Sequence, residues 1–143
     1  METSGAPSVE VIAVSAEKVP EFWPLAHEYI WPAFERFPGE ATYEDITKRL
    51  LEGNMVLWIA WNGEEILGGA ITALENYPSG MRAVRGIALG GKQFESWQQP
   101  LDDILEQFGK SWGAQRIEFY GRKGWEKRLP NYKVNRIMVT RDI

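Results

Sequence analysis

The chain has 143 residues, 44% of them hydrophobic, which is enough for one domain of ordinary size with a packed core. It has no cysteine, which excludes a disulfide framework, a thiolate nucleophile and a cysteine zinc site. The net charge of −4 disfavours extensive nucleic-acid binding. Residues 116–143, however, hold eight basic and three acidic residues, which predicts either a local anion-attracting surface or a charged, solvated edge strand.

The beginning of the chain, "METSGAPS", has neither the basic region nor the apolar core of a signal peptide. No apolar run approaches the roughly 20 residues that a membrane span needs. We therefore expect a flexible N-terminus over 1–8, a single domain over 9–143, and a cytoplasmic protein without membrane association.

The first expected elements are a strand and two helices. "VEVIAV" (9–14) is rich in β-branched residues and predicts a strand, after which Ser15 predicts the start of a helix over 16–30. Prolines in this region break the helix into short pieces or mark its first turn: Pro20, Pro24 and Pro32. Thr42, with Asp45 three residues later, predicts a second capped helix.

The middle of the chain predicts an antiparallel meander. "MVLWIAW" (55–61) is a continuous apolar run typical of a strand buried on both faces. "NGEE" (62–65) predicts a hairpin turn into a return strand at 66–75. A third sheet strand follows at 81–91.

The last third predicts a crossover. Apolar residues at helical spacing predict a helix over 96–112, which Gly113 ends. Further elements are expected as a strand at 115–121, a short helix at 122–129 and a closing strand at 132–143. A meander followed by a β-α-β crossover predicts an α/β (α+β) protein with a mixed, mostly antiparallel sheet and helices on both faces.

This order resembles the GNAT fold of the N-acyltransferase superfamily, which includes relatives of histone and aminoglycoside acetyltransferases. "MVLWIAWNGEEILGGAI" (55–71) is similar to the family's second hairpin. The strand-helix-strand-helix order of 81–129 carries the rest of the resemblance. It is followed by an aromatic residue at the place where the family often has a glycine and an aromatic residue. The sequence pattern "GRKGW…L…YK" also resembles that of small uncharacterised GNAT-like proteins of bacteriophages. The resemblance covers nearly the whole chain, from Val9 to Ile143.

The resemblance implies acetyl-CoA as the acyl donor. In the family, backbone N–H groups after the third sheet strand cradle its pyrophosphate at a helix N-terminus. Here that loop reads "GGKQFES", without the family's Gln/Arg-x-x-Gly-x-Gly/Ala signature, and acids expected at the helix start, Glu95, Asp102 and Asp103, would repel a pyrophosphate. The expected cofactor-binding residues are Leu89, Gly90, Gly91, Lys92, Ser96, Arg122 and Trp125.

The resemblance also implies a carboxylate that deprotonates the amine and a tyrosine that protonates the departing thiolate. The strand at 81–89 carries two arginines and no acid, and the family's tyrosine position falls near Arg128. We expect Glu118, on a strand expected to be central, to be the base, with Arg122 as its partner or as an anion clamp. The expected acid is Tyr120 or Tyr132. The alternative to a catalytic role is that Glu118 forms a purely structural ion pair with an arginine.

Three functions remain open. The leading one is an acyltransferase that moves an acetyl or acyl group from acyl-CoA to an amine. The second is a non-catalytic GNAT-like phage protein, a virion component or host-factor binder that has lost the pyrophosphate loop. The third is a DNA-modifying relative that uses the basic 116–143 segment, which could also bind another macromolecule. No metal is expected, because the single histidine, His27, lacks companions at ligand spacing.

Overall fold

The computed structural model describes residues 8–121 and 124–143 of the chain. Five strands form one sheet in the order β1-β2-β3-β4-β5. The elements are β1 Glu10–Val14, η1 Ala16–Lys18, α1 Val19–Glu35, α2 Tyr43–Leu51, β2 Val56–Trp61, β3 Ile66–Asn76, β4 Arg82–Gly91, α3 Phe94–Trp112, β5 Arg116–Phe119 and η2 Trp125–Lys127. Neighbouring strands are antiparallel except β4 and β5, which run parallel and are joined through α3. The expected mixed sheet is therefore confirmed.

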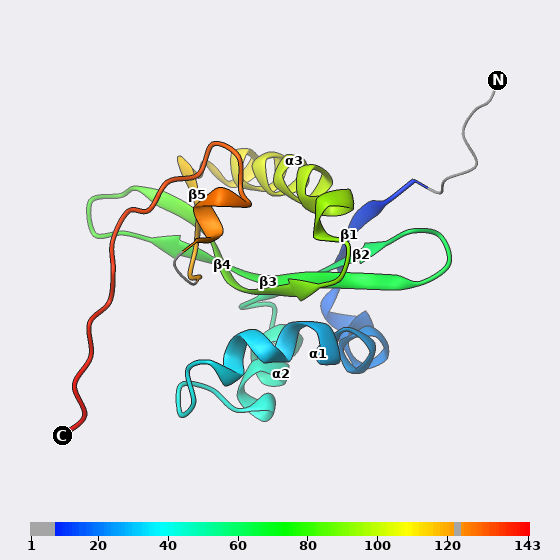
Figure 1. The fold of residues 1–143 in the computed structure, drawn as a ribbon, viewed down its shortest axis with the longest axis horizontal. Helices are drawn as coiled ribbons and strands as arrows, with labels where there is room; N and C mark the ends of the chain where they lie inside the picture. Colours follow the sequence, from blue (N-terminus) through cyan, green and yellow to red (C-terminus); the bar gives the residue numbers. More distant parts are fainter. Residues whose placement is uncertain (1–7, 122–123) are drawn as a thin grey trace.

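The sheet is covered by helices on both faces (Figure 1). Helix α3 packs on one face through Trp97, Leu101 and Leu105, and α1 and α2 pack on the other. Strand β2 serves both layers, because Leu57 belongs to the α1–α2 side and Trp58 to the α3 side. This explains why its sequence is continuously apolar instead of alternating.

The predicted hairpin forms between β2 and β3. The Asn62 side chain accepts hydrogen bonds from the backbone N–H groups of Glu64 and Glu65, at 2.9 and 2.8 Å. Gly63 has a φ of +95°, in the left-handed region that glycine adopts without a steric penalty. The Asn-Gly pair therefore fixes this turn for the reason that the sequence suggested.

Two of the three prolines in α1 do not break the helix. Pro20 lies in the first turn, as one alternative predicted, but Pro24 and Pro32 lie inside a single helix that runs to Glu35. Both are exposed, whereas Trp23 and Ile30 on the opposite face are almost completely buried. Burial of that apolar face against the sheet offsets the backbone bonds that the prolines remove.

The capping box predicted for α2 is present. Oγ1 of Thr42 accepts a hydrogen bond from the Asp45 N–H, and Oδ2 of Asp45 accepts one from the Thr42 N–H, at 3.1 and 3.0 Å. Each side chain satisfies a backbone N–H that would otherwise lack a partner at the helix start.

Helix α3 begins two residues earlier than predicted, at Phe94, and ends at Trp112 with Gly113 in the left-handed conformation. Asp102 and Asp103 therefore lie two turns inside the helix, and the expectation that they stand at its start is wrong. Glu95 is the acid of the first turn.

The C-terminal part of the chain departs most from the sequence prediction. The closing strand at 132–143 is wrong: residues 133–143 are exposed and form no strand, although they are β-branched and apolar enough to favour one. The helix predicted over 122–129 is reduced, among described residues, to η2. Within the described part of the chain β5 is consequently an edge strand and not the central strand expected.

Candidate functional site

Strands β4 and β5 pair over a short distance and then separate. Their last register pair is Gly86 with Phe119, and the last hydrogen bond runs from the Tyr120 N–H to the Gly86 carbonyl, at 3.1 Å. Strand β4 then has a bulge at Ile87 and continues beside β3 as far as Gly91. We call the separation of β4 residues 87–91 from the end of β5 the strand parting.

Among the described residues, the backbone on the open side of β4 has no hydrogen-bond partner beyond Gly86. The Lys92 N–H bonds to the Leu67 carbonyl of β3, at 2.8 Å. Because backbone groups alternate along a strand, those of Leu89 and Gly91 are turned away from β3. These groups lie beyond the last described bond to β5, so they face the strand parting.

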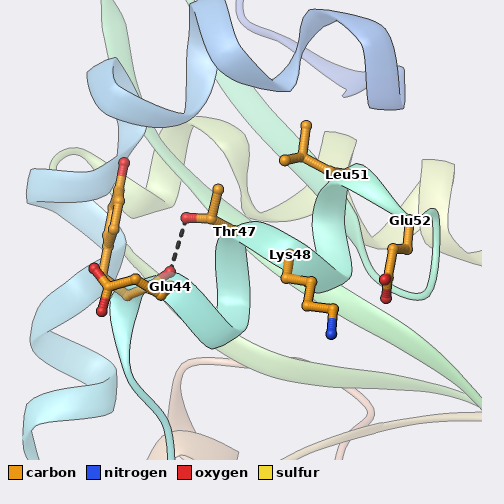
Figure 2. Close-up of a pocket in the computed structure, with 6 residues that line it drawn as sticks. Glu44, Thr47, Lys48, Leu51 and Glu52 are labelled. Atoms are coloured by element: carbon orange, nitrogen blue, oxygen red, sulfur yellow. Dashed lines mark hydrogen bonds between the residues drawn. The ribbon is translucent and has the colours of Figure 1, made fainter.

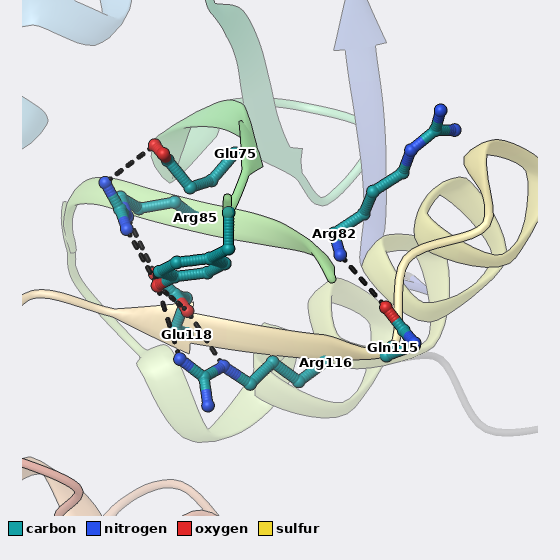
Figure 3. Close-up of polar contacts among 7 residues, drawn as sticks. Glu75, Arg82, Arg85, Gln115, Arg116 and Glu118 are labelled. Atoms are coloured by element: carbon teal, nitrogen blue, oxygen red, sulfur yellow. Dashed lines mark hydrogen bonds and ion pairs between the residues drawn. The ribbon is translucent and has the colours of Figure 1, made fainter. Parts of the chain in front are cut away.

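A polar cluster lies directly before the strand parting (Figure 3). Glu118 on β5 accepts hydrogen bonds from Arg85 Nε at 2.7 Å, from Arg116 Nε at 2.9 Å and from the Tyr77 hydroxyl at 2.8 Å. Arg85 also donates to Glu75 Oε1, at 2.8 Å. The Glu118 side chain is 20% exposed, so the cluster is partly buried and still open to a ligand.

This cluster keeps Glu118 ionised. Burial raises the pKa of Glu118, but hydrogen bonds from Tyr77, Arg85 and Arg116 outweigh it, and the pKa lies below its ordinary value. Burial lowers the pKa of Arg85, but bonds to Glu118 and Tyr77 raise it above its ordinary value. Glu118 is therefore an ionised carboxylate that two guanidinium groups and a tyrosine hydroxyl already contact.

The sequence identified Glu118 but not its partners. Arg122, the partner expected, lies outside the described residues, and Arg85 and Arg116 take that role. A signal for Arg85 existed, because an arginine within an apolar strand needs a neighbouring acid. Tyr77 and Glu75 come from the turn after β3 and its last residues, and no local pattern pointed to them.

The two candidate acids have different surroundings. Tyr120 follows Glu118 by two residues and is 58% exposed. The Arg85 guanidinium lies 5.1 Å from the centre of its ring. The Tyr132 hydroxyl donates to Oδ1 of Asp102 at 2.7 Å, and burial together with this bond raises its pKa well above the ordinary range. Of the two, only Tyr120 contacts the polar cluster, through Arg85, and is largely exposed.

The double glycine allows tight packing at the end of β4. A Cβ on Gly90 would overlap the Tyr29 carbonyl of α1, and a Cβ on Gly91 would overlap the Leu67 carbonyl of β3. Gly91 also has a φ of +145°. The requirement for glycine at both positions thus comes from the close approach of α1 and β3.

Lys92, between β4 and α3, and Ser96, in the first turn of α3, already have partners within the chain. The Lys92 ammonium lies 3.0 Å from Glu65 Oε1, and this pair raises the pKa of the exposed lysine. The Ser96 hydroxyl donates to the Gln93 carbonyl, at 2.7 Å. A ligand that bound Lys92 would have to compete with Glu65.

A second cation stands at the start of α3. The Arg128 guanidinium lies 5.2 Å from the ring centres of both Phe94 and Trp125, and one of its nitrogens is 3.6 Å from a Glu95 oxygen. Arg128 is half exposed. This arrangement holds a positive charge beside the N-terminus of α3, where the helix dipole also favours an anion.

Two surface hollows lie away from the strand parting. The larger, about 440 Å³, lies on α2 and is lined by Tyr43, Glu44, Thr47, Lys48, Leu51 and Glu52 (Figure 2). The smaller, about 240 Å³, lies between the β2–β3 ladder and Phe108. Neither includes a residue of the polar cluster or of the segment before α3.

His27 lies among aromatic rings of α1 and α2. Its ring centre is 5.4 Å from Trp23, 5.2 Å from Trp31 and 4.7 Å from Tyr43. In the described part of the chain, no cluster of three or more metal-ligating side chains occurs. No described helix is both long enough and apolar enough to span a bilayer.

The fold is that of known acetyltransferases. An aminoglycoside acetyltransferase from an uncultured soil metagenomic sample, in complex with trehalose, superposes with a TM-score of 0.67 at 12% identity, over 94% of this chain and 96% of that one. A ribosomal-protein-alanine N-acetyltransferase from Brucella melitensis gives a TM-score of 0.66 at 15% identity, over 94% and 100% of the two chains. A predicted acetyltransferase with acetyl-CoA from Clostridium acetobutylicum gives 0.66 at 13% identity, over 93% and 96%.

These similarities establish the GNAT fold and support nothing finer, because the identities are low. No protein-family model and no curated protein matches the sequence. The comparisons give no support to the resemblance to bacteriophage proteins.

Proposed function

We propose that the protein is a GNAT-fold N-acyltransferase that transfers an acetyl or acyl group from acyl-CoA to an amine. The observation that carries this proposal is the position of the Glu118 cluster, directly before the point where β4 and β5 separate. An ionised carboxylate with a tyrosine hydroxyl beside it suits an amine acceptor. The open backbone of β4 beyond it suits the acyl end of the donor.

The residues before α3 suit the phosphate end of the donor. Among solved structures with this fold, the Clostridium acetyltransferase was crystallised with acetyl-CoA. In this chain the first turn of α3 and Arg128 combine backbone N–H groups with a guanidinium, which is chemistry that phosphates require. Lys92 adds a second cation once it is released from Glu65. Leu89, Gly90, Gly91, Ser96 and Trp125 would form the surrounding surface, and Arg122 is proposed as a further contact.

On the acceptor side, the roles follow from charge. Acyl-CoA supplies the activated thioester carbonyl. Glu118 would orient the amine and accept its proton, directly or through water, and Tyr120, whose ring lies beside Arg85, would donate a proton to the leaving thiolate. Because the pKa of Glu118 is lowered, the proton does not remain on it, and solvent removes it. Tyr132 is the weaker candidate, because Asp102 holds its proton.

A non-catalytic protein that uses this fold for binding is the second candidate. It is favoured by a specific observation: the amide and the ammonium of Lys92 are both paired within the chain, with Leu67 and Glu65. In that case Glu118 and Arg85 would serve only to join β4 and β5, and the basic 116–143 segment would be the place where a macromolecular partner binds.

The two candidates are separated by an acetyl-transfer assay on the full chain. The protein is mixed with acetyl-CoA and a panel of primary amines, and the released CoA thiol is titrated. Since the chain contains no cysteine, the thiol reagent has no protein background. We expect thiol release that depends on the amine, lowered at least roughly tenfold in Glu118→Gln. Glu64→Gln, an exposed acid in the β2–β3 turn, is the control. Failure of every amine to release thiol favours the binding protein.

A further inference from the structure

Arg116, at the start of β5, uses only one edge of its guanidinium inside the polar cluster. Its Nε donates to Glu118 Oε1 at 2.9 Å, and its Nη2 donates to the Tyr77 hydroxyl at 3.2 Å. These two nitrogens form one edge of the planar guanidinium. No described residue accepts a hydrogen bond from the third nitrogen, Nη1, and Figure 3 shows it directed away from Glu118. The second edge, which Nη1 forms with the other N–H of Nη2, is therefore open.

Arg85, the other guanidinium of the cluster, has no such open edge. Its Nε donates to Glu118, and its two terminal nitrogens donate to Glu75 and to the Tyr77 hydroxyl. Every nitrogen of Arg85 thus has a partner within the chain. Its side chain is 18% exposed, compared with 33% for Arg116. Of the two arginines, Arg116 is the one that combines unused donors with access for a ligand.

The open edge of Arg116 has the geometry that binds a carboxylate. Two parallel N–H groups on one edge of a guanidinium match the two oxygens of a carboxylate and give a charge-assisted pair. Glu118 and Tyr77 hold the other edge, and the guanidinium lies 5.3 Å from the centre of the Tyr77 ring. Among the described residues, Glu118 is the single acid that pairs with Arg116. Because the group is held before a ligand binds, binding costs little side-chain entropy.

Arg116 lies on the same face of β5 as the candidate base. Side chains alternate along the strand, so Ile117 and Phe119 pack towards α3, whereas Arg116 and Glu118 belong to the polar cluster on the other face. The strands separate after Phe119, three residues beyond Arg116, which is about 10 Å along a strand. An elongated ligand bound to Arg116 therefore extends past Glu118 to the strand parting.

We propose that Arg116 selects acceptors that carry a carboxylate at the end opposite to the amine. This inference rests on the proposed acyltransferase function and adds the class of acceptor, an ω-amino acid or a similar elongated amine with a terminal carboxylate. The amine would reach Glu118 and the strand parting, while the carboxylate would bind Nη1 and Nη2 of Arg116. An α-amino acid is too short to span these points, because its amine and its carboxylate are attached to the same carbon.

The charges of the polar cluster also favour a zwitterionic acceptor. Arg85 and Arg116 offset Glu75 and Glu118, so the cluster has no net charge. An ammonium at Glu118 together with a carboxylate at Arg116 preserves this balance. A simple alkylamine adds one positive charge without a counter-charge to a partly buried site, which is unfavourable.

The test compares matched acceptors in the thiol-release assay with acetyl-CoA. The acceptors are ω-amino acids from glycine to aminooctanoate and, at each length, the alkylamine that lacks the carboxylate. We expect kcat/KM to favour the acid roughly tenfold at the longer lengths, and no such preference for glycine. In Arg116→Gln, the acid and the alkylamine should become equivalent substrates. Arg49→Gln, an exposed arginine of α2, is the control and should keep the preference of the parent.

The preference for the acid over the alkylamine separates carboxylate binding from an indirect effect, because Arg116 also contacts Glu118. A fall of kcat/KM by the same factor for both acceptors in Arg116→Gln would mean that Arg116 acts only through Glu118, and the proposal would be wrong. It would also be wrong if the parent preferred the acid at no length. Arg116→Lys keeps the charge of the cluster and should retain part of the preference, which provides a second variant if the glutamine variant does not fold.

Binding of aminooctanoate without acyl-CoA distinguishes this inference from the proposed function. The guanidinium resonances of Arg116 should shift on titration, and the dissociation constant should rise roughly tenfold in Arg116→Gln. Such binding without thiol release from any amine would support the carboxylate site and contradict the acyltransferase. Thiol release without a preference for the acid would support the acyltransferase and contradict the carboxylate site. Equal binding of aminooctanoate by the parent and Arg116→Gln would overturn the proposal.

Discussion

Arg85 of β4 and Glu118 of β5 lie opposite each other in the parallel ladder, and Arg85 Nε donates to Glu118 Oε2 at 2.7 Å. The Arg85 side chain is 18% exposed, so the pair is largely shielded from water. This ion pair joins the two strands immediately before they separate, and it sets the charge state of the candidate base.

Replacing Arg85 should destabilise the fold. Arg85→Ala leaves Glu118 and Glu75 without their shared cation, and we expect the free energy of unfolding to fall by about 1–3 kcal/mol. The free energy of unfolding of Arg85→Lys should lie between those of the parent and Arg85→Ala, because one ammonium cannot make all the hydrogen bonds of the guanidinium. Urea denaturation measures the change, with the exposed Arg36→Ala as control. An Arg85→Ala midpoint equal to that of the parent would mean that the cluster contributes nothing to stability.

The lowered pKa of Glu118 predicts a pH dependence of stability. A carboxyl whose pKa is lower in the folded state contributes stability above its unfolded pKa, about 4.3, and loses it as the pH falls through the folded value. Glu118→Gln should therefore be less stable than the parent at pH 7, and the difference should shrink towards pH 3. Glu64→Gln should show no such convergence. A difference in stability between Glu118→Gln and the parent that widens on acidification would contradict a lowered pKa of Glu118.

Lys92 and Glu65 should act in opposite directions on donor binding. Lys92→Ala removes a cation beside α3 and should weaken acetyl-CoA binding roughly ten- to hundredfold. Glu65→Gln frees the ammonium from its partner and should strengthen binding. Lys48→Ala, on α2, is the control. Calorimetric titration measures the affinity of each of the three variants for acetyl-CoA. If all three bind it as tightly as the parent, Lys92 is not part of the phosphate site.

Leu105 tests the α3 layer. It is completely buried in the cluster beneath α3, so Leu105→Ala should lower the free energy of unfolding by about 2–5 kcal/mol. Leu51→Ala removes the same atoms from a side chain that is 47% exposed and should cost much less. Comparable losses for the two variants in denaturant would contradict the assignment of the buried face of α3.

Periodicity and turn chemistry predicted most of the fold. The 3.6-residue spacing of Trp97, Leu101 and Leu105, the Asn62-Gly63 turn and the Thr42–Asp45 cap are local signals, and the structure contains each of them. The prolines of α1 and the segment 133–143 gave local signals that tertiary structure overrides. In α1 burial maintains the helix through Pro24, and at the C-terminus no described strand pairs with residues that favour extended backbone.

The candidate site was less predictable, because its contacts join distant parts of the chain. Glu118 was identified from its place in an apolar strand, but Tyr77 lies 41 residues away and Arg85 33. The double glycine is needed for packing against Tyr29 and Leu67, and only the folded backbone reveals this.

The most direct test of the proposed acyltransferase function is calorimetric titration of the full chain with acetyl-CoA, accompanied by thermal unfolding at each concentration. We expect saturable binding with one site per chain. The unfolding temperature should rise with ligand, in line with about 2.7 kcal/mol of added stability at a hundredfold excess over the dissociation constant. Neither heat nor a change in unfolding temperature at millimolar acetyl-CoA would contradict the acyltransferase assignment.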